Sequence, residues 1–142
     1  MSTPDPMIVH RCNIRVRYAD TDQMRIVYNG KYFEYFEVGR TELLRDLGFP
    51  YAAVEEAGIR LLVIEAHCRY YSPALYDDLI TIETRVYDLP TARMRIDYNV
   101  YRGETLLVAG YTVHAFQDSK LNRPVRPPAF FLEMLMKGFQ VG

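Results

Sequence analysis

The segment Tyr18 to Arg45, YADTDQMRIVYNGKYFEYFEVGRTELLR, decides the fold of this chain. A polar turn with Asp20 and Asp22 leads into a long apolar-periodic pattern, which predicts a helix over residues 30–47. Gly48 follows as a stop signal. Large side chains recur at spacings of three and four residues and predict one buried stripe, made of Phe33, Phe36, Arg40, Leu43, Leu44 and Leu47.

The rest of the chain alternates between apolar and polar positions, which is the pattern of β-strands. Strands are expected over residues 8–18, 60–71, 79–88, 93–101 and 105–117. The segment 60–71 lacks clean alternation, which predicts a strand covered on both faces or central in the sheet. Short connections between the later strands predict antiparallel pairing. The predicted fold class is α+β, with a five-stranded antiparallel sheet and one long helix packed on it.

Length and composition describe one folded domain. A chain of 142 residues with 49% hydrophobic and 25% charged residues can bury one core and is too short for two ordinary domains. We interpret residues 1–142 as a single domain with loose tails at 1–7 and 138–142, the second tail following a short helix at 130–137. Seventeen basic and eighteen acidic residues give a net charge of −1, which argues against a general nucleic-acid binder.

No segment of the sequence predicts export or membrane insertion. The N-terminus MSTPDPM lacks the basic and apolar regions of a signal peptide. No apolar run approaches the roughly 20 residues that span a bilayer. The expected location is the cytoplasm, where Cys12 and Cys68 stay reduced.

The start of the predicted helix, over residues 27–30, is where we expect chemistry. A helix N-terminus leaves backbone N–H groups unpaired and carries partial positive charge, so it can polarise a carbonyl oxygen. A nearby carboxylate supplies a base or a nucleophile. Asp22 suits that role, but aspartate also favours Asx turns and helix caps, and both interpretations stay open. Asp20 is expected to shape the turn or to pair with an arginine.

Several motifs occur in an order typical of one family. The specific block is Asp20-Thr21-Asp22-Gln23-Met24 with Val27-Tyr28-Asn29-Gly30 and Tyr32-Phe33-Glu34-Tyr35-Phe36-Glu37; residues 63–70, Pro73, Tyr76-Asp77-Asp78-Leu79 and residues 110–116 match later blocks. The chain resembles the hotdog-fold 4-hydroxybenzoyl-CoA thioesterase-like family, in particular bacterial acyl-CoA thioesterases of the Tol–Pal-associated type. The resemblance implies a hotdog fold, in which the sheet wraps around the long helix. It also implies homodimers joined edge to edge, a further pairing into homotetramers, and active sites between subunits.

The resemblance also implies an activity and the residues that carry it. An acyl-CoA and water would give a free acid and CoA, with Asp22 as the catalytic carboxylate and the backbone N–H of Asn29 as the oxyanion donor. No metal is implied, and no cofactor beyond the coenzyme A of the substrate. The residues expected at the substrate are Tyr28, Gly30, Tyr32 and His67, with Lys120, Arg123 and Arg126 near the CoA phosphates. A structural role in the core or on a solvated loop is the alternative for each.

Two positions depart from the family pattern. Arg25 stands where relatives commonly have glycine, which tolerates positive φ, and Asn29 stands where many relatives have histidine. Arg25 favours one alternative, a non-catalytic acyl-CoA-binding or scaffold protein. A second alternative is a thioesterase acting on acyl carrier protein. Acyl chain length, aromatic against aliphatic preference, base against nucleophile for Asp22, and dimer against tetramer stay open.

Overall fold

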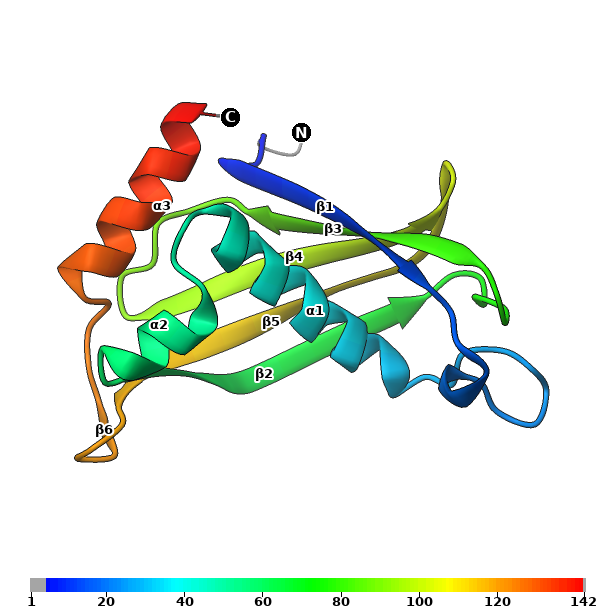
Figure 1. Ribbon diagram of the computed structural model, residues 1–142, viewed down its shortest axis with the longest axis horizontal. Helices are drawn as coiled ribbons and strands as arrows, with labels where there is room; N and C mark the ends of the chain where they lie inside the picture. Colours follow the sequence, from blue (N-terminus) through cyan, green and yellow to red (C-terminus); the bar gives the residue numbers. More distant parts are fainter. Residues whose placement is uncertain (1–4, 142) are drawn as a thin grey trace.

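Five long antiparallel strands curl around one helix in the computed structural model, which describes residues 5–141 (Figure 1). The strands are β1 (Ile8–Arg15), β2 (Ile59–Tyr70), β3 (Leu79–Val86), β4 (Arg93–Arg102) and β5 (Thr105–Asp118). Their order in the sheet is β1-β3-β4-β5-β2, and a two-residue strand, β6 (Arg123–Pro124), pairs with β5. The predicted α+β fold, with an antiparallel sheet wrapped around one long helix, is confirmed, and the sheet gains β6. Residues 1–4 of the predicted tail lie outside the described residues.

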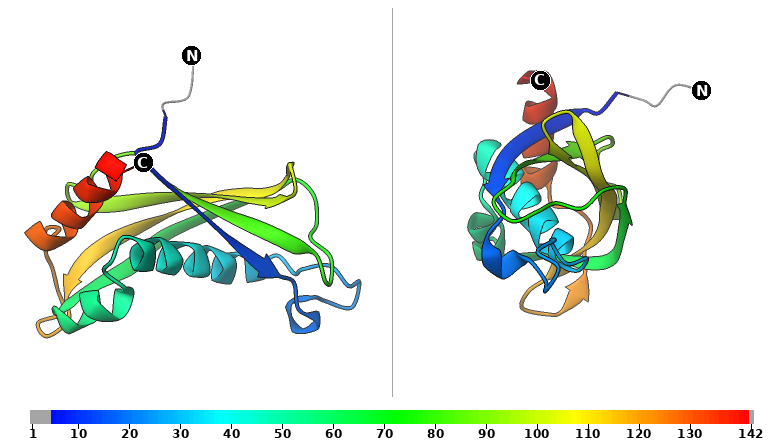
Figure 2. Two further views of the ribbon diagram at one scale, coloured as in Figure 1. Left: turned by 45° about the horizontal axis from the view of Figure 1, so that its top comes forward. Right: turned by 90° about the vertical axis from the view of Figure 1, so that its right-hand side faces the viewer.

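The long helix α1 (Lys31–Asp46) lies in the concave face of the sheet, as the end-on view in Figure 2 shows. Its buried residues are Tyr32, Tyr35, Phe36, Gly39, Leu43 and Leu44. The predicted stripe is confirmed at Phe36, Leu43 and Leu44 and is wrong at Phe33, which is 37% exposed. Tyr32 and Tyr35 are buried in its place, so the buried face is rotated at the start of the helix. The two tyrosines can be buried because their hydroxyl groups have partners, the amide of Ala74 and the carboxylate of Asp20.

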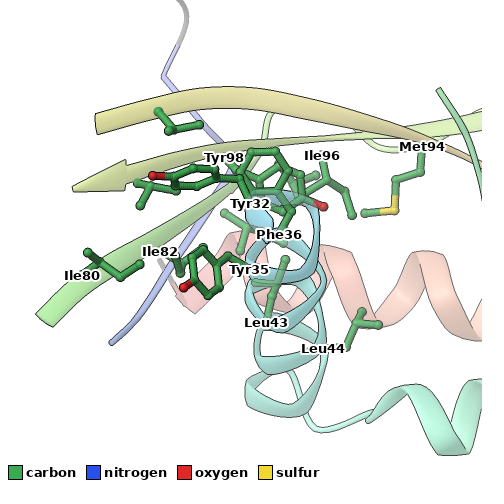
Figure 3. Close-up of a cluster of buried hydrophobic side chains, with 14 of the residues drawn as sticks. Tyr32, Tyr35, Phe36, Leu43, Leu44, Ile80, Ile82, Met94, Ile96 and Tyr98 are labelled. Atoms are coloured by element: carbon green, nitrogen blue, oxygen red, sulfur yellow. The ribbon is translucent and has the colours of Figure 1, made fainter. Parts of the chain in front are cut away.

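Small residues let α1 approach the sheet closely. A methyl group on Gly39 would lie 2.8 Å from Cγ2 of Ile82, and one on Gly110 of β5 would lie 2.8 Å from the ring of Phe36. The Phe36 ring instead stacks on Tyr98 of β4, with centroids 4.3 Å apart. Figure 3 shows these aromatic rings among the buried aliphatic side chains of β3 and β4. This packing fixes the height of the helix, and therefore of its N-terminus, above the sheet.

Strand β2 is an edge strand, so the prediction that it is central or covered on both faces is wrong for the single chain. Leu62, Val63 and Ile64 are 40%, 46% and 45% exposed. The alternation of its side chains is broken because the pairing with β5 shifts between Val63 and Glu65. The edge of the sheet therefore carries apolar side chains and unpaired backbone groups.

The two ends of the molecule differ. Helices α2 (Tyr51–Glu56) and α3 (Ala129–Val141) lie at one end, and the segment 18–30, which begins with the 3₁₀ helix η1 (Tyr18–Asp20), lies at the other (Figure 1). Residues 138–141 continue α3 rather than forming the expected loose tail. Among the described residues, no helix is both long and apolar enough to cross a membrane.

Candidate active site

The loop before α1 is a small hairpin whose two arms pair between Thr21 and Val27. The Asp22 N–H donates to the carbonyl of Ile26 at 2.9 Å, and the Arg25 N–H donates to the carbonyl of Asp22 at 3.0 Å. Arg25 has φ of 63°, which is the left-handed conformation that glycine adopts without strain. Arginine therefore preserves the backbone turn at this position, at an energetic cost that glycine would not have.

Asp22 is exposed at the tip of this hairpin. Its Oδ1 accepts a hydrogen bond of 2.8 Å from the N–H of Met24, which is the Asx turn that one interpretation predicted. Its Oδ2 has no hydrogen-bond or ion-pair partner among residues 5–141. The turn fixes the orientation of the carboxylate and leaves one oxygen free.

Asp20 is the buried anchor of the loop, with 1% of its surface exposed. Its Oδ2 accepts from the Arg17 N–H at 3.0 Å and from the Tyr35 hydroxyl at 2.9 Å, and its Oδ1 lies 3.2 Å from Nζ of Lys31. Burial alone would raise the pKa of Asp20, but these hydrogen bonds and the Lys31 charge hold it below the ordinary value. Nη2 of Arg17 also lies 3.4 Å from Oδ1 of Asp20, so both parts of the expectation are confirmed: Asp20 shapes the turn and pairs with an arginine.

Lys31 is a residue that the sequence analysis missed, although the sequence held a signal for it. A lysine in the first turn of a helix faces the positive end of the helix dipole, which is unfavourable unless a carboxylate lies nearby. Here the Lys31 ammonium group lies 3.2 Å from Oδ1 of Asp20 and also 3.2 Å from Oε2 of Glu34.

The start of α1 presents backbone donors. The N–H groups of Asn29 and Gly30 have no backbone acceptor among residues 5–141, while the Asn29 carbonyl accepts a 2.8 Å hydrogen bond from the hydroxyl of Tyr70. Burial and the neighbouring Cys68 thiol raise the pKa of Tyr70 to about 12, so this hydroxyl keeps its proton at neutral pH. Tyr70 thus holds the peptide before the helix from the side of β2.

A pocket of about 250 Å³ lies against this helix start. Its lining includes Ile26 and Val27 of the loop, Asn29 and Tyr32 of the helix start, Tyr70 of β2 and the segment 71–73. The rings of Tyr32 and Tyr70 meet edge to face with centroids 5.6 Å apart. A free carboxylate oxygen, free amides and a concave surface therefore belong to one end of the molecule.

The sequence model of the thioesterase-like superfamily matches residues 16–135. The chain belongs to the thioesterase-like superfamily. The acyl-CoA thioesterase YbgC of Haemophilus influenzae is 32% identical over 116 residues, which cover 81% of this chain and 85% of that protein.

Solved structures give the same answer for the fold. A hypothetical protein from Thermus thermophilus superposes with a TM-score of 0.85 at 31% identity, covering 92% of this chain and 97% of that one. The DHNA-CoA thioesterase of Staphylococcus aureus superposes with a TM-score of 0.84 at 27% identity, covering 94% and 90%. The predicted hotdog fold, the resemblance to thioesterases and the prediction of a thioester hydrolase are confirmed.

Of the residues expected at the substrate, Tyr32 and Gly30 lie at the helix start of this thioesterase-like chain. Tyr32 is buried in the core and also lines the pocket. Tyr28 is 47% exposed, and its ring covers Gly30 so closely that a methyl group on Gly30 would lie 2.8 Å from Cε2 of Tyr28. Tyr28 shields the helix start and does not line the pocket.

The other expected contacts lie elsewhere within one chain. His67 is on the outer face of β2, stacked on Tyr111 with centroids 5.3 Å apart. Lys120, Arg123 and Arg126 are exposed on the loop around β6. Figure 1 shows β6 at the opposite end of the sheet from the segment 18–30. A single chain does not bring any of these four residues together with the Asp22 hairpin.

Proposed function

We propose that this chain hydrolyses acyl-CoA thioesters, with Asp22 as base or nucleophile and the backbone N–H of Asn29 as oxyanion donor. The observation that carries the proposal is the free Oδ2 of Asp22 on a loop that leads directly into a helix start with unpaired N–H groups. Those N–H groups would stabilise the negative charge that develops on the thioester oxygen. The relatives named as acyl-CoA thioesterases support CoA as the carrier.

The proposed hydrolysis requires only a carboxylate, a backbone amide and water. As base, Asp22 takes a proton from a water that attacks the carbonyl carbon, the C–S bond breaks, and the CoA thiolate leaves and is protonated. As nucleophile, Asp22 itself displaces the thiolate and forms a mixed anhydride, which water then cleaves. Both routes use the carboxylate, the amide and water, so coenzyme A enters only as part of the substrate.

We also propose a homodimer that pairs the β2 edges, and a homotetramer as its further assembly. The exposed Leu62, Val63 and Ile64 and the unpaired edge of β2 support such a contact. A partner there would cover the side of α1 next to the helix start and complete the site around Asp22. Ile64→Lys would then give a monomer in light scattering and lose activity together with the dimer.

The alternative of a non-catalytic binding protein rested on Arg25. The observed φ of 63° shows that arginine adopts the turn that glycine would, so this alternative loses its main support. The decisive experiment measures CoA release from a panel of acyl-CoAs with a thiol reagent, in the wild type and in Asp22→Asn.

Asparagine keeps the Asx turn, because its oxygen can still accept from the Met24 N–H, and removes only the charge. We expect a loss of about 10²–10⁴-fold in kcat, the usual contribution of a positioned acid or base. Acyl-CoA binding without release by the wild type would instead identify a binding protein. The same acyl group offered on CoA and on acyl carrier protein separates the carrier alternatives by the ratio of kcat/KM.

Base and nucleophile can also be separated. In a single turnover in H₂¹⁸O with enzyme in excess, a nucleophilic route in which water attacks the Asp22 carbon of the anhydride leaves ¹⁸O in the Asp22 side chain. Mass spectrometry of the peptide that contains Asp22 detects that label. Label that appears only in the released acid is the result of a general-base route, or of a nucleophilic route in which water attacks the acyl carbon of the anhydride; trapping the anhydride with hydroxylamine then separates these two.

A further inference from the structure

A cavity of about 140 Å³ lies between α1, β4 and α3, away from the helix start. Figure 3 shows Met94 and Ile96 of β4 extending toward the half of α1 that carries Leu43 and Leu44. These four side chains line the cavity together with Leu61 of β2 and Phe131 of α3. Tyr51 of α2 and the polar residues Glu37, Arg40 and Thr41 of α1 complete the lining, which comes from five different elements and is mostly apolar.

The cavity is only partly enclosed. Leu43, Met94 and Phe131 are buried, whereas Glu37 at its margin is exposed. An apolar cavity of about 150 Å³ binds benzene, so a space of this size has room for roughly six carbon atoms. Its apolar walls therefore suit the end of a hydrocarbon chain.

A groove that begins at Phe33 leads along one side of α1 to this cavity. The groove has a volume of about 250 Å³ and lies between α1 and β2, with Phe33 on the helix and Val63 and Ala66 on the strand. It shares Glu37 and Arg40 with the cavity. Phe33 is one turn beyond Asn29, so the proposed oxyanion donor, the groove and the cavity follow one another along the helix.

The length of this route can be estimated from helix geometry. Twelve residues separate Asn29 from Thr41, which lines the cavity, and a rise of 1.5 Å per residue gives about 18 Å. Carbon–carbon bonds of about 1.5 Å advance an extended chain by about 1.25 Å each, so the route accommodates about 14 carbons.

We propose that the groove beside α1 and the cavity under Phe131 form an acyl-chain channel, which makes long-chain acyl thioesters of about 14 carbons the substrate class. This inference rests on the proposed thioesterase function, because it takes the thioester to lie at Asn29. The end of the acyl chain occupies the cavity, and α3 forms the wall that limits its length.

The junction between groove and cavity carries two charged side chains, Glu37 and Arg40. The Arg40 guanidinium has no carboxylate within 4.0 Å among residues 5–141. It lies near the sheet, where its charge contributes, after burial, to the low pKa of His114. The aliphatic stem of such a side chain offers apolar surface to a passing chain while the charged head stays with polar partners.

The test compares acyl-CoAs from four to eighteen carbons in the wild type and three variants. Leu61→Trp fills the cavity, and Met94→Ala enlarges it. Val100→Ala is the control: Val100 also faces inward from β4 and is fully buried, but it lines neither the groove nor the cavity. Affinities are measured in parallel on the Asp22→Asn background, where intact tetradecanoyl-CoA and butanoyl-CoA serve as ligands.

The wild type is expected to favour about 14 carbons. Leu61→Trp should lower the ratio of tetradecanoyl to butanoyl kcat/KM by at least about tenfold, since each buried methylene contributes roughly fourfold to binding. Met94→Ala should move the optimum to longer chains by about two carbons, because alanine leaves empty the space that the end of the Met94 side chain now fills. Val100→Ala should leave the chain-length profile in place.

The outcomes separate the two proposals. CoA release with a profile that no cavity variant changes overturns the channel and leaves the hydrolase. Affinity for tetradecanoyl-CoA that Leu61→Trp weakens, without CoA release by the wild type, supports the channel and overturns the hydrolase. Should Leu61→Trp fail to fold, Met94→Ala decides alone through the shift of the optimum.

Discussion

The two aspartates of the Asp20-Thr21-Asp22 turn should have opposite roles, and substituting each by asparagine separates them. Asp20→Asn and Asp22→Asn make the same chemical change two residues apart. Asp20 is buried with three kinds of donors around it, whereas Asp22 is exposed with one oxygen free. We expect the first substitution to reduce stability and the second to reduce the rate of hydrolysis.

The magnitude follows from the contacts of Asp20. An amide in its place can still accept from the Arg17 N–H and the Tyr35 hydroxyl, but its NH₂ group then faces the Lys31 ammonium group, 3.2 Å away from the present Oδ1. Breaking a buried ion pair costs about 3–5 kcal/mol, and Lys31 keeps Glu34 as a second partner, which places the expected loss near 3 kcal/mol. Asp22→Asn keeps its Asx turn in solvent and should change stability by less than about 0.5 kcal/mol.

Urea unfolding at pH 7 measures the first effect, and CoA release under conditions where both variants are folded measures the second. The folded-state pKa of Asp20 lies below its ordinary value of 3.8, so its stabilising effect is present above that value and is lost as the pH falls through the folded pKa. The gap between wild type and Asp20→Asn should therefore close in strong acid. Equal stability losses in the two variants, or full activity in Asp22→Asn, would refute this division of roles.

Three further predictions concern the packing and the loop. Burial, and then the Arg40 charge, lower the pKa of His114 from 6.5 to about 4. Because the unfolded chain takes up the proton at higher pH than the folded chain, the free energy of unfolding should fall by about 3 kcal/mol between pH 6.5 and 4. In urea titrations, His114→Gln should flatten that pH dependence. Gly39→Ala should lower the urea midpoint despite better helix propensity, because its methyl would lie 2.8 Å from Cγ2 of Ile82; an overpacked core typically costs about 1–3 kcal/mol. Arg25→Gly should relieve left-handed backbone strain of about 1 kcal/mol and keep kcat/KM, whereas Arg25→Ala should keep the strain. Equal melting temperatures for the two variants would show that the positive φ of residue 25 does not reduce stability.

The sequence predicted the framework well because hydrophobic periodicity is a local property. Alternation located β1, β3, β4 and β5, and three-four spacing located α1 within one residue of its observed bounds. It failed on the rotation of α1, where Tyr32, Phe33, Tyr35 and Phe36 offer two aromatic faces of similar hydrophobicity. The choice between them depends on hydroxyl partners at Asp20 and Ala74, which lie outside the helix and are fixed only by the tertiary fold.

The candidate site was predictable only where its residues lie close together in the sequence. Asp22 and Asn29 lie on one continuous segment, so their neighbourhood follows from local structure. His67, Lys120, Arg123 and Arg126 come from other elements, and their faces and ends of the sheet depend on strand order. No pattern along the sequence states that order directly.

Two of the places where the single chain disagrees with expectation would have one explanation in the proposed dimer. Strand β2 has the composition of a covered strand, yet it is an edge with Leu62, Val63 and Ile64 exposed. Asp22 lies in a block typical of a catalytic site, yet it stands in solvent. Both features belong to surfaces that a second subunit on the β2 edge would cover, because the groove beside α1 is lined by residues of that strand. A sequence is selected in its assembled state, so in the proposed dimer its hydrophobic pattern would report burial in the assembly rather than in one chain. If Ile64→Lys separated the subunits while activity persisted, β2 would have to be covered by something other than the partner that completes this site.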